Sequence, residues 1–380
     1  MQFWVVFYAI GAAQAALLAL ALWRRISNPA ANRLLALWLA LVALDLCMRA
    51  QFFSTPDPRL FKAYLFVTLF PFLHGSLFYL YVRTLTSGRG LRRADARHFA
   101  GFAVILAFQF PYLLADAETT MALFARWQYG TLSSSLWPSV FLFVYSLSYV
   151  AAGAVRLSRY RQALRARRSD ADLLSLHWVD AMLAGQLMIW GIAAAQAWLP
   201  TPHLDARLIY GAVAAWVCAI GYLSLHQPAM EEAAASLPEN DEPTPVVPNE
   251  DDSRFPEVEA KLALLMQRDA LYLEPALTIA QVAKRSGYPE YLVSAVINRR
   301  LGGNFWDYIS RLRIDAVCAA LSDPDDTRTV LDIAYACGFT SKSTFNAVFK
   351  RQLGTTPSAY RAARLRATTA SAESPRTPPG

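Results

Sequence analysis

The sequence predicts an all-α protein, with a bundle of seven transmembrane helices followed by an all-helical domain that contains two helix-turn-helix motifs. Three observations predict this class. Seven apolar stretches occupy residues 1–225, residues 279–308 resemble residues 330–360, and 55% of the 380 residues are hydrophobic while only 17% are charged. Because soluble domains carry about 25% charged residues, part of this chain should face lipid.

The seven apolar stretches have the length of membrane-spanning helices, since about 20 apolar residues cross ~30 Å of hydrocarbon. The fourth stretch is the shortest and contains Pro111, so its ends are the least regular. The first is followed directly by Arg24 and lacks a basic segment before it, which argues against a cleaved signal peptide. The stretches are approximately Phe3–Trp23, Leu34–Phe53, Ala63–Val82, His98–Leu114, Leu136–Val155, Trp178–Leu199 and Leu208–Leu225.

The loops between these stretches alternate in charge. The first, third and fifth loops hold 14 basic residues, whereas the second, fourth and sixth hold four. Because short basic loops stay in the cytoplasm, we expect a multi-pass protein of the bacterial cytoplasmic membrane with its N-terminus outside and its C-terminus inside. This topology alone accounts for the arginines of the fifth loop, so we assign that loop no separate binding role.

Three ionisable residues inside the predicted spans are candidates for sensing a stimulus. Asp45 and Arg49 lie one helical turn apart in the second stretch, where they can pair. His74 lies near the middle of the third stretch. Ionisable groups at membrane depth often mark function. A structural contact between helices is the competing explanation, and we favour it.

The sequence shows no sign of catalysis. It contains no HExxH motif, no glycine-rich phosphate loop and no GxSxG motif, and its four cysteines form no CxxC pair. Isolated cysteines in helices usually serve as small buried hydrophobic residues. We therefore predict that the protein is not an enzyme and has no catalytic residues, no metal site and no cofactor.

Two segments have a composition that cannot form a core. Residues 226–254 are rich in proline and in acidic side chains, and residues 367–380 are small and polar. Such segments remain disordered because they bury too little apolar surface. We expect a flexible linker that tethers residues 255–366 near the membrane while leaving them free to reorient, and a disordered tail after them.

Residues 255–366 contain the repeated helix-turn-helix pattern. Val282-Ala283 matches Ile333-Ala334 at an offset of 51, and Leu301-Gly302 matches Leu353-Gly354 at an offset of 52. Capping residues predict the helix boundaries. The expected helices are 256–268, 279–286, 289–300, 305–321, 330–337, 342–353 and 357–365, with N-caps at Thr278, Asn304, Thr329 and Ser341. The apolar face expected on the central helix consists of Phe305, Tyr308, Ile309, Leu312, Ala316 and Ala319.

This domain resembles the DNA-binding domain of the AraC/XylS family of bacterial transcription regulators. The resemblance covers a little under a third of the chain. It implies an all-helical domain whose two helix-turn-helix motifs place recognition helices in successive major-groove segments of double-stranded promoter DNA. The residues that carry the resemblance are Ile333, Ala334, Gly338, Phe339, Phe345, Phe349, Lys350, Gly354, Pro357, Tyr360 and Arg361.

The candidate DNA contacts follow from helix geometry, because a helix in the major groove presents its N-terminal and outward side chains to base edges. The base-contact candidates are Tyr291, Ser294 and Asn298 in the first motif and Lys342, Ser343 and Asn346 in the second. The phosphate-contact candidates are Arg299, Arg300, Ser341, Lys350 and Arg351.

The sequence departs from the family pattern at several positions, most of them in the first motif. Pro289 stands where a capping serine is usual, and Glu290 places a negative charge near the DNA backbone. Ala295 and Ala347 stand where basic or amide side chains are common. We therefore expect the second motif to supply most of the sequence specificity.

The leading hypothesis is a membrane-embedded regulator that couples an unknown signal, sensed by the transmembrane bundle, to binding of promoter DNA. One alternative is a membrane sensor or transporter-like protein whose C-terminal domain mediates protein contacts. A membrane enzyme with an added regulatory domain is disfavoured because catalytic motifs are missing. The predicted partners are the lipid bilayer, promoter DNA and the signal, and homodimerisation stays open.

Overall fold

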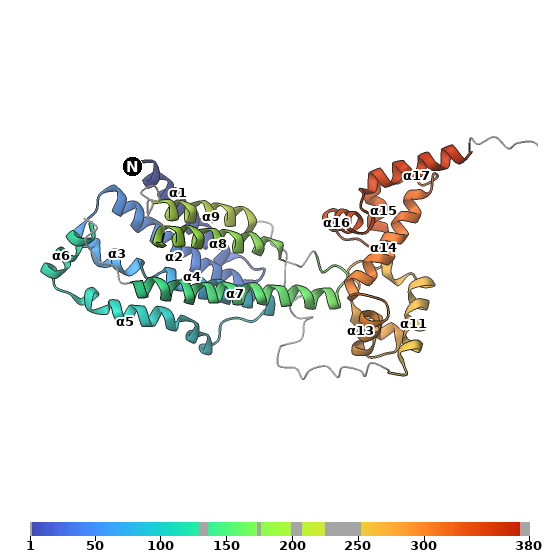
Figure 1. Ribbon diagram of the computed structural model, residues 1–380, viewed down its shortest axis with the longest axis horizontal. Helices are drawn as coiled ribbons and strands as arrows, with labels where there is room; N and C mark the ends of the chain where they lie inside the picture. The colour runs from blue at the N-terminus through green and yellow to red at the C-terminus, as the bar shows by residue number, and fades with distance from the viewer. Residues whose placement is uncertain (1, 129–135, 173–175, 199–206, 225–251, 373–380) are drawn as a thin grey trace, which may run out of the picture. The chain divides into compact units, whose positions relative to one another are not determined.

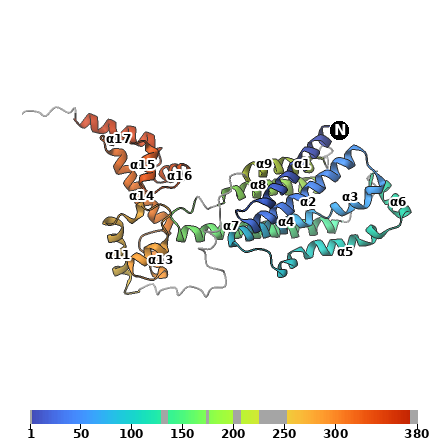
Figure 2. The ribbon, with the colours of Figure 1, turned by 180° about the vertical axis from the view of Figure 1, so that it is seen from behind.

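The computed structural model describes residues 2–128, 136–172, 176–198, 207–224 and 252–372 (Figures 1 and 2). Within these residues every regular element is a helix, and the one strand-like pairing is an antiparallel bridge between Arg168 and Thr278. The predicted all-α class is therefore confirmed. The chain divides into an N-terminal unit, Met1–Arg159 with Leu176–Leu237, and a C-terminal unit, Tyr160–Ser175 with Pro238–Gly380.

The N-terminal unit is a bundle of long apolar helices. Helix α1 packs along α2 and α9, and α9 packs against α8, so that these helices lie side by side in Figures 1 and 2. Tyr8 of α1, Trp38 of α2 and Phe78 of the fourth helix are buried in this unit. The helices are α1 Gln2–Arg24, α2 Pro29–Ser54, α3 Phe61–Val67, α4 Pro71–Ser87, α5 Ala100–Leu114, α6 Ala117–Gln128, α7 Leu136–Arg167, α8 His177–Trp198 and α9 Arg207–Ser224, with 3₁₀ turns η1 Pro58–Leu60 and η2 Arg93–Phe99.

Six segments of the described chain are long and apolar enough to cross a membrane, and they correspond to the first six predicted stretches. The seventh predicted stretch forms a shorter apolar helix, Arg207–Ile220, within α9. The six segments are Gln2–Arg24, Pro29–Ser54, Pro58–Ser87, Arg93–Leu114, Trp137–Arg167 and His177–Trp198.

Two of these segments differ from the sequence prediction. The third stretch is broken between α3 and α4, and α4 restarts at Pro71. Proline has no N–H and restricts the residue before it, so it favours the first turn of a helix over its interior. Helix α7 continues past the predicted end at Val155 to Arg167. The added residues are rich in Arg, Ala and Leu, which are strong helix formers.

The C-terminal unit contains the two helix-turn-helix motifs around a central helix (Figure 1). The first motif is α12 Ile279–Ser286 and α13 Glu290–Arg299, and the second is α15 Val330–Ala336 and α16 Lys342–Leu353. Helix α14, Phe305–Ser322, connects them. The remaining elements are α11 Phe255–Gln267, the 3₁₀ turn η3 Leu271–Leu273 and α17 Pro357–Ala372.

The four predicted N-caps are confirmed. The side chains of Thr278, Asn304, Thr329 and Ser341 each accept a hydrogen bond from the backbone N–H three residues further on. These bonds satisfy N–H groups that have no partner inside the helix. Pro289, at the corresponding position before α13, makes no side-chain cap, as the sequence predicts.

Three expectations about this unit need correction. The buried face of α14 includes Trp306, Ser310 and Arg313, while Ala319 is exposed. The central helix packs against both motifs, so it buries more than the single stripe that the sequence pattern indicates. Helix α17 continues to Ala372, so residues 367–372 are helical rather than part of a disordered tail, and their alanines favour this. The predicted linker, residues 226–254, lies mostly outside the described residues.

The fifth loop differs from the predicted domain boundary. This boundary assigns residues 156–177 to the membrane domain, whereas residues 160–172 belong to the C-terminal unit. The positive-inside pattern explains the arginines of this loop but carries no information about packing. The domain boundary at residue 225 is therefore incomplete, because a second segment joins the C-terminal unit.

Candidate nucleic-acid interface

Helix α16 separates a buried apolar face from an exposed polar face. Phe345 and Phe349 are buried in the unit, and their rings are in edge contact, with centroids 5.7 Å apart. Lys342, Ser343 and Asn346, the base-contact candidates of the second motif, are all exposed in the first two turns of the helix. This is the arrangement in which a helix can enter the major groove and present polar side chains to base edges.

The turn before α16 requires a glycine. Gly338 has φ +88°, in the left-handed region where glycine is favoured. A Cβ atom at this position would lie 2.7 Å from the backbone oxygen of Leu273 and 2.9 Å from Nε of Arg313. The turn therefore packs directly against the 3₁₀ turn that precedes the first motif, which fixes the position of α16 within the unit.

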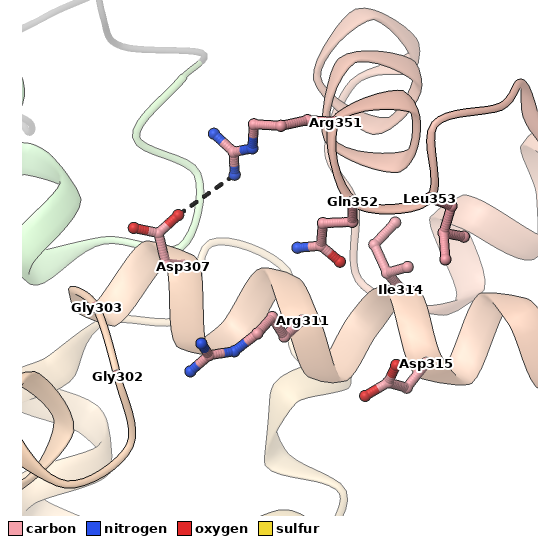
Figure 3. Close-up of a pocket in the computed structure, with 9 residues that line it drawn as sticks. All are labelled: Gly302, Gly303, Asp307, Arg311, Ile314, Asp315, Arg351, Gln352 and Leu353. Atoms are coloured by element: carbon pink, nitrogen blue, oxygen red, sulfur yellow. Dashed lines mark hydrogen bonds and ion pairs between the residues drawn. The ribbon is translucent and has the colours of Figure 1, made fainter.

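Two of the phosphate-contact candidates on α16 have different surroundings. Lys350 is exposed. Arg351 forms an ion pair with Asp307 of α14, with 3.3 Å between Nη2 and Oδ1, and lies 4.7 Å from the ring centre of Trp306. Figure 3 shows Arg351 pointing toward Asp307. In this structure Arg351 therefore joins the second motif to the start of the central helix.

Ser341 is engaged as the cap of α16. Its Oγ accepts the backbone N–H of Thr344 at 3.1 Å and also contacts the hydroxyls of Thr344 and Ser343. The cap leaves the helix N-terminus, which carries a partial positive charge, at the same end as Lys342. A helix end of this kind favours phosphate oxygens, so Ser341 positions the end that would contact the DNA backbone.

The first motif exposes fewer polar groups. Tyr291 is half-buried and packs against the hydrophobic core around α11 and α13. Ser294 is also half-buried, and its Oγ accepts a hydrogen bond from Nδ2 of the exposed Asn298 at 3.3 Å. Ala295, which stands where basic or amide side chains are common in the resembled family, is buried. The three candidates lie along one side of α13, and only Asn298 is fully exposed.

The phosphate-contact candidates of the first motif lie at the end of α13. Arg299 and Arg300 are both exposed, and the Arg299 guanidinium lies 5.9 Å from the ring centre of Phe255. Glu290 occupies the opposite end, in the first turn of α13. The positive charge of this helix is therefore concentrated at its C-terminal end.

A groove of about 570 Å³ separates the start of α14 from the end of α16 (Figure 3). It is open to solvent and carries both charge signs, so it lacks the enclosed apolar walls of a small-molecule site. Its lining residues are Gly302, Gly303, Asp307, Arg311, Ile314, Asp315, Arg351, Gln352 and Leu353. No cluster of metal-ligating side chains occurs in the part of the chain that the structure describes.

Arg313 is a buried residue that the sequence analysis did not identify. It is 2% exposed, and its guanidinium donates to the backbone oxygens of Tyr272 and Glu274, each at 2.8 Å. The same group lies 5.9 Å from the ring centre of Phe339. Burial lowers the pKa of Arg313 to about 10, although the negative charge of Asp170 acts to raise it. Arg313 thus connects the central helix, the 3₁₀ turn and the second motif.

The three candidate sensing residues are paired in the N-terminal unit. Asp45 and Arg49 are both buried and form the predicted ion pair, with 3.1 Å between Oδ1 and Nε. The Arg49 guanidinium lies 4.6 Å from the ring centre of Tyr210. His74 accepts, through Nδ1, a hydrogen bond of 2.9 Å from Nε1 of Trp38. Both groups join different helices of the bundle.

Similar proteins share the C-terminal region. Residues 282–363 match the family described as helix-turn-helix domain. The regulatory protein SoxS of Escherichia coli K12 is 34% identical over 90 residues, which cover 24% of this chain and 82% of SoxS. The probable transcription factor PqrA of Proteus vulgaris is 29% identical over 85 residues, covering 22% of this chain and 68% of PqrA. No solved structure matches the chain with significance.

A longer relative matches over a smaller share of its own length. The melibiose operon regulatory protein of Escherichia coli K12 is 35% identical over 88 residues, which cover 23% of this chain and 28% of that protein. SoxS, in contrast, consists mostly of the shared region. The shared region therefore occurs in SoxS without a large additional domain.

Proposed function

Because the chain belongs to the AraC/XylS family of bacterial transcription regulators, we propose that it controls promoters as a membrane-embedded, sequence-specific DNA-binding protein. It is a DNA-binding transcription regulator and not an enzyme. In this proposal the N-terminal unit spans the cytoplasmic membrane and responds to a stimulus, and the C-terminal unit binds double-stranded promoter DNA.

The observation that carries the proposal is the exposed face of α16. Lys342, Ser343 and Asn346 are exposed on a capped helix whose other face is held in the core. Asparagine can pair with the N6 and N7 atoms of adenine, and lysine with O6 and N7 of guanine. Each such pair discriminates against the wrong base by about 1–3 kcal/mol. We assign the main base readout to these side chains.

In the proposal, backbone contacts come from the basic residues near the helix ends. Lys350 and Arg300 are exposed and carry charge beside the recognition helices. For each phosphate contact, a tenfold rise in salt concentration lowers the logarithm of the binding constant by about 0.9. Lys350 and Arg300 therefore supply affinity that is independent of sequence, together with Arg299.

Membrane embedding is supported by the outward faces of the long helices. Leu17, Phe108, Val144 and Met188 are more than half exposed, although each belongs to a segment long enough to span a bilayer. Water-soluble proteins seldom expose apolar patches larger than a few hundred Å². Contact with lipid would remove the cost of exposing these side chains to water.

The proposed orientation can be tested with reporter fusions. Fusions that end in the second or fourth loop should be active with a periplasmic reporter, and fusions that end in the third loop or at the C-terminus with a cytoplasmic reporter. The loop charges predict this pattern. A periplasmic C-terminus would rule out contact with the chromosome and would contradict the proposal.

In the proposal, a stimulus acts by favouring one of two arrangements of the bundle, since a ligand shifts an equilibrium only through different affinities for two states. Arg49, which pairs with Asp45 within α2, also contacts the ring of Tyr210 on α9, and the His74–Trp38 bond joins α4 to α2, so a rearrangement of these helices would have to change both sets of contacts. Leaving one charge of a buried pair unpaired is costly. We therefore assign these pairs a part in setting which arrangement is stable.

DNA binding is tested with residues 252–372 and a library of genomic fragments. We expect selection of a defined sequence and a steep loss of affinity as salt rises. Asn346→Ala and Lys342→Ala should each weaken binding to the selected site about 5- to 150-fold, corresponding to about 1–3 kcal/mol. Binding to random DNA should change much less for Asn346→Ala.

The matched controls are Lys261→Ala and Gln267→Ala on α11, where the same charge and the same kind of amide are removed from exposed positions. Both should leave affinity within about twofold, because surface changes away from a contact have small effects. Enrichment of no sequence, with equal losses in control and test variants, would favour a role in protein contacts.

A further inference from the structure

A segment from the loop between α7 and α8 belongs to the C-terminal unit. We refer to residues 160–172 as the docking segment. It comprises the last turns of α7, which ends at Arg167, and the turn that follows, residues 169–172. The loop charge explains why this segment is basic but not why it packs against the helix-turn-helix motifs.

The docking segment pairs with the first motif through the backbone. Arg168 forms the antiparallel bridge with Thr278, and the N–H of Ser169 donates to the oxygen of Leu277 at 2.9 Å. Thr278 is the N-cap of α12. The segment is thus attached directly to the residue at which the first motif begins.

The turn of the docking segment is buried in the unit. Ser169, Asp170 and Ala171 are 4%, 7% and 2% exposed. Nη2 of Arg313 donates to Oγ of Ser169 at 3.1 Å, and Arg168 holds the Asp170 carboxylate through bonds of 2.8 and 3.0 Å. Buried polar groups are costly unless hydrogen-bonded, so these bonds are typical of a specific interface rather than a loose loop.

Two further arginines of the segment contact side chains of α13 and α14. Arg167 lies 3.8 Å from Glu290 in the first turn of α13. Arg165 lies 5.0 Å from the ring centre of Trp306, and Arg351 of α16 lies 4.7 Å from the centre of the same ring. The segment therefore contacts the first motif directly and shares an aromatic partner with the second.

We propose that the surface formed by Leu277, Thr278, Glu290, Trp306 and Arg313 is a binding site for residues 160–172 of the same chain, and that docking of this segment sets how well the two recognition helices bind DNA. The effect on DNA rests on the proposed function, whereas docking itself does not. Helix α7 is continuous from Leu136 to Arg167, so movement of the fifth apolar segment reaches the first motif without passing through the linker.

The site fits this occupant for reasons of charge and hydrogen bonding. It presents a carboxylate, an aromatic face and the backbone oxygen of Leu277, and the segment supplies two arginines and the backbone N–H that this oxygen accepts. Cation–π contacts contribute about 0.5–1 kcal/mol where exposed. Because several modest contacts act together, the segment can dock and release.

Docking is tested in the full-length protein in membranes with the cysteine pair Arg168→Cys and Thr278→Cys. The four native cysteines are first replaced by alanine. Residues paired across an antiparallel bridge have Cβ atoms about 4.5–5.5 Å apart, close to disulfide distance. We expect rapid disulfide formation under mild oxidation. The matched control pairs Arg168→Cys with Thr329→Cys, because Thr329 is the equivalent N-cap of the second motif.

The consequence for DNA is measured on the same protein. We expect the affinity of the oxidised form for its selected site to differ at least fivefold from that of the reduced form, and reductant to reverse the change. Adding Ser169→Pro, which removes the N–H that donates to Leu277, should slow formation of the disulfide at least fivefold.

Each result decides a separate statement. A disulfide that forms no faster than in the Thr329→Cys control would overturn docking. Equal DNA affinities of the oxidised and reduced forms would overturn its control of binding. If neither form binds any DNA specifically while the disulfide forms rapidly, the proposed function fails and docking stands.

Discussion

Replacing Gly338 by alanine should destabilise the C-terminal unit much more than replacing Gly287 by alanine. Both glycines form the turn of a helix-turn-helix motif, with φ +88° and +80°. An L-residue in the left-handed region costs about 1–2 kcal/mol, and alanine recovers about 0.4–1 kcal/mol by restricting the unfolded chain. The backbone effect is therefore a net loss of about 1 kcal/mol at either position.

The two sites differ in the space around the glycine. A Cβ at Gly287 would meet no heavy atom within 4 Å, whereas a Cβ at Gly338 would meet the Leu273 oxygen at 2.7 Å and Nε of Arg313 at 2.9 Å. Relief of this clash would displace the Arg313 guanidinium from its bonds to Tyr272 and Glu274. A hydrogen bond to a charged group contributes about 1.5–3 kcal/mol.

We therefore expect the free energy of unfolding to fall by about 1 kcal/mol in Gly287→Ala and by about 4–7 kcal/mol in Gly338→Ala, where both bonds of Arg313 are lost as well. The measurement is urea unfolding of residues 252–372, monitored by circular dichroism at 222 nm. The dependence of the free energy of unfolding on urea concentration should be equal in the two variants. Equal losses in the two variants would refute the argument, because only local steric contact distinguishes them.

Three further predictions follow from individual contacts. Arg313→Lys should lower the free energy of unfolding by about 2–3 kcal/mol in the same urea titration, because lysine cannot hold two carbonyl oxygens in a fork; Arg268→Lys, at an exposed site, should change it by less than about 0.5 kcal/mol. Tyr291→Phe should leave DNA affinity within about twofold in a binding titration, since the ring packs on the core; a tenfold loss would show that its hydroxyl contacts DNA. The side-chain hydrogen bond from Arg328 holds the pKa of Asp326 at about 2. The contact between these two side chains therefore stabilises the folded state fully above pH 3.8, and this stabilisation is lost as pH falls through 2. A carboxyl titration by NMR should show a midpoint that moves up toward 3.8 in Arg328→Ala, and an unmoved midpoint would contradict this cause.

The regular parts of the C-terminal unit could be predicted because local chemistry determines them. Thr278, Asn304, Thr329 and Ser341 cap their helices through bonds within a single turn. The glycine at each motif's turn follows from the backbone conformation that the turn needs. The same local logic predicted the Asp45–Arg49 pair, since residues four apart share one face of a helix.

The contacts that connect distant segments could not be predicted. The sequence pattern places Arg313 on the polar face of an amphipathic helix. It is nevertheless buried, and its guanidinium donates to a backbone oxygen of the 3₁₀ turn. Arg168 and Thr278 are paired although they are separated by more than 100 residues, and no periodicity relates them. The outward position of Tyr291 on a helical wheel likewise does not reveal that its half-buried ring packs on the core.

The two motifs differ in their surroundings. The second motif combines a capped helix with three exposed polar side chains at its N-terminal end. The first motif starts without a side-chain cap, places Tyr291 against its core and buries Ala295. We therefore interpret the second motif as the one that supplies sequence specificity.

The first motif is also where the rest of the chain attaches. Arg168 pairs with its N-cap, Thr278, and Arg167 faces Glu290 at the start of its recognition helix. A carboxylate at this position would repel DNA phosphates, and a neighbouring guanidinium reduces that repulsion. In the proposal, Glu290 weakens DNA binding by the first motif and at the same time receives the basic docking segment. The contribution of the first motif to DNA binding would then depend on whether that segment is docked.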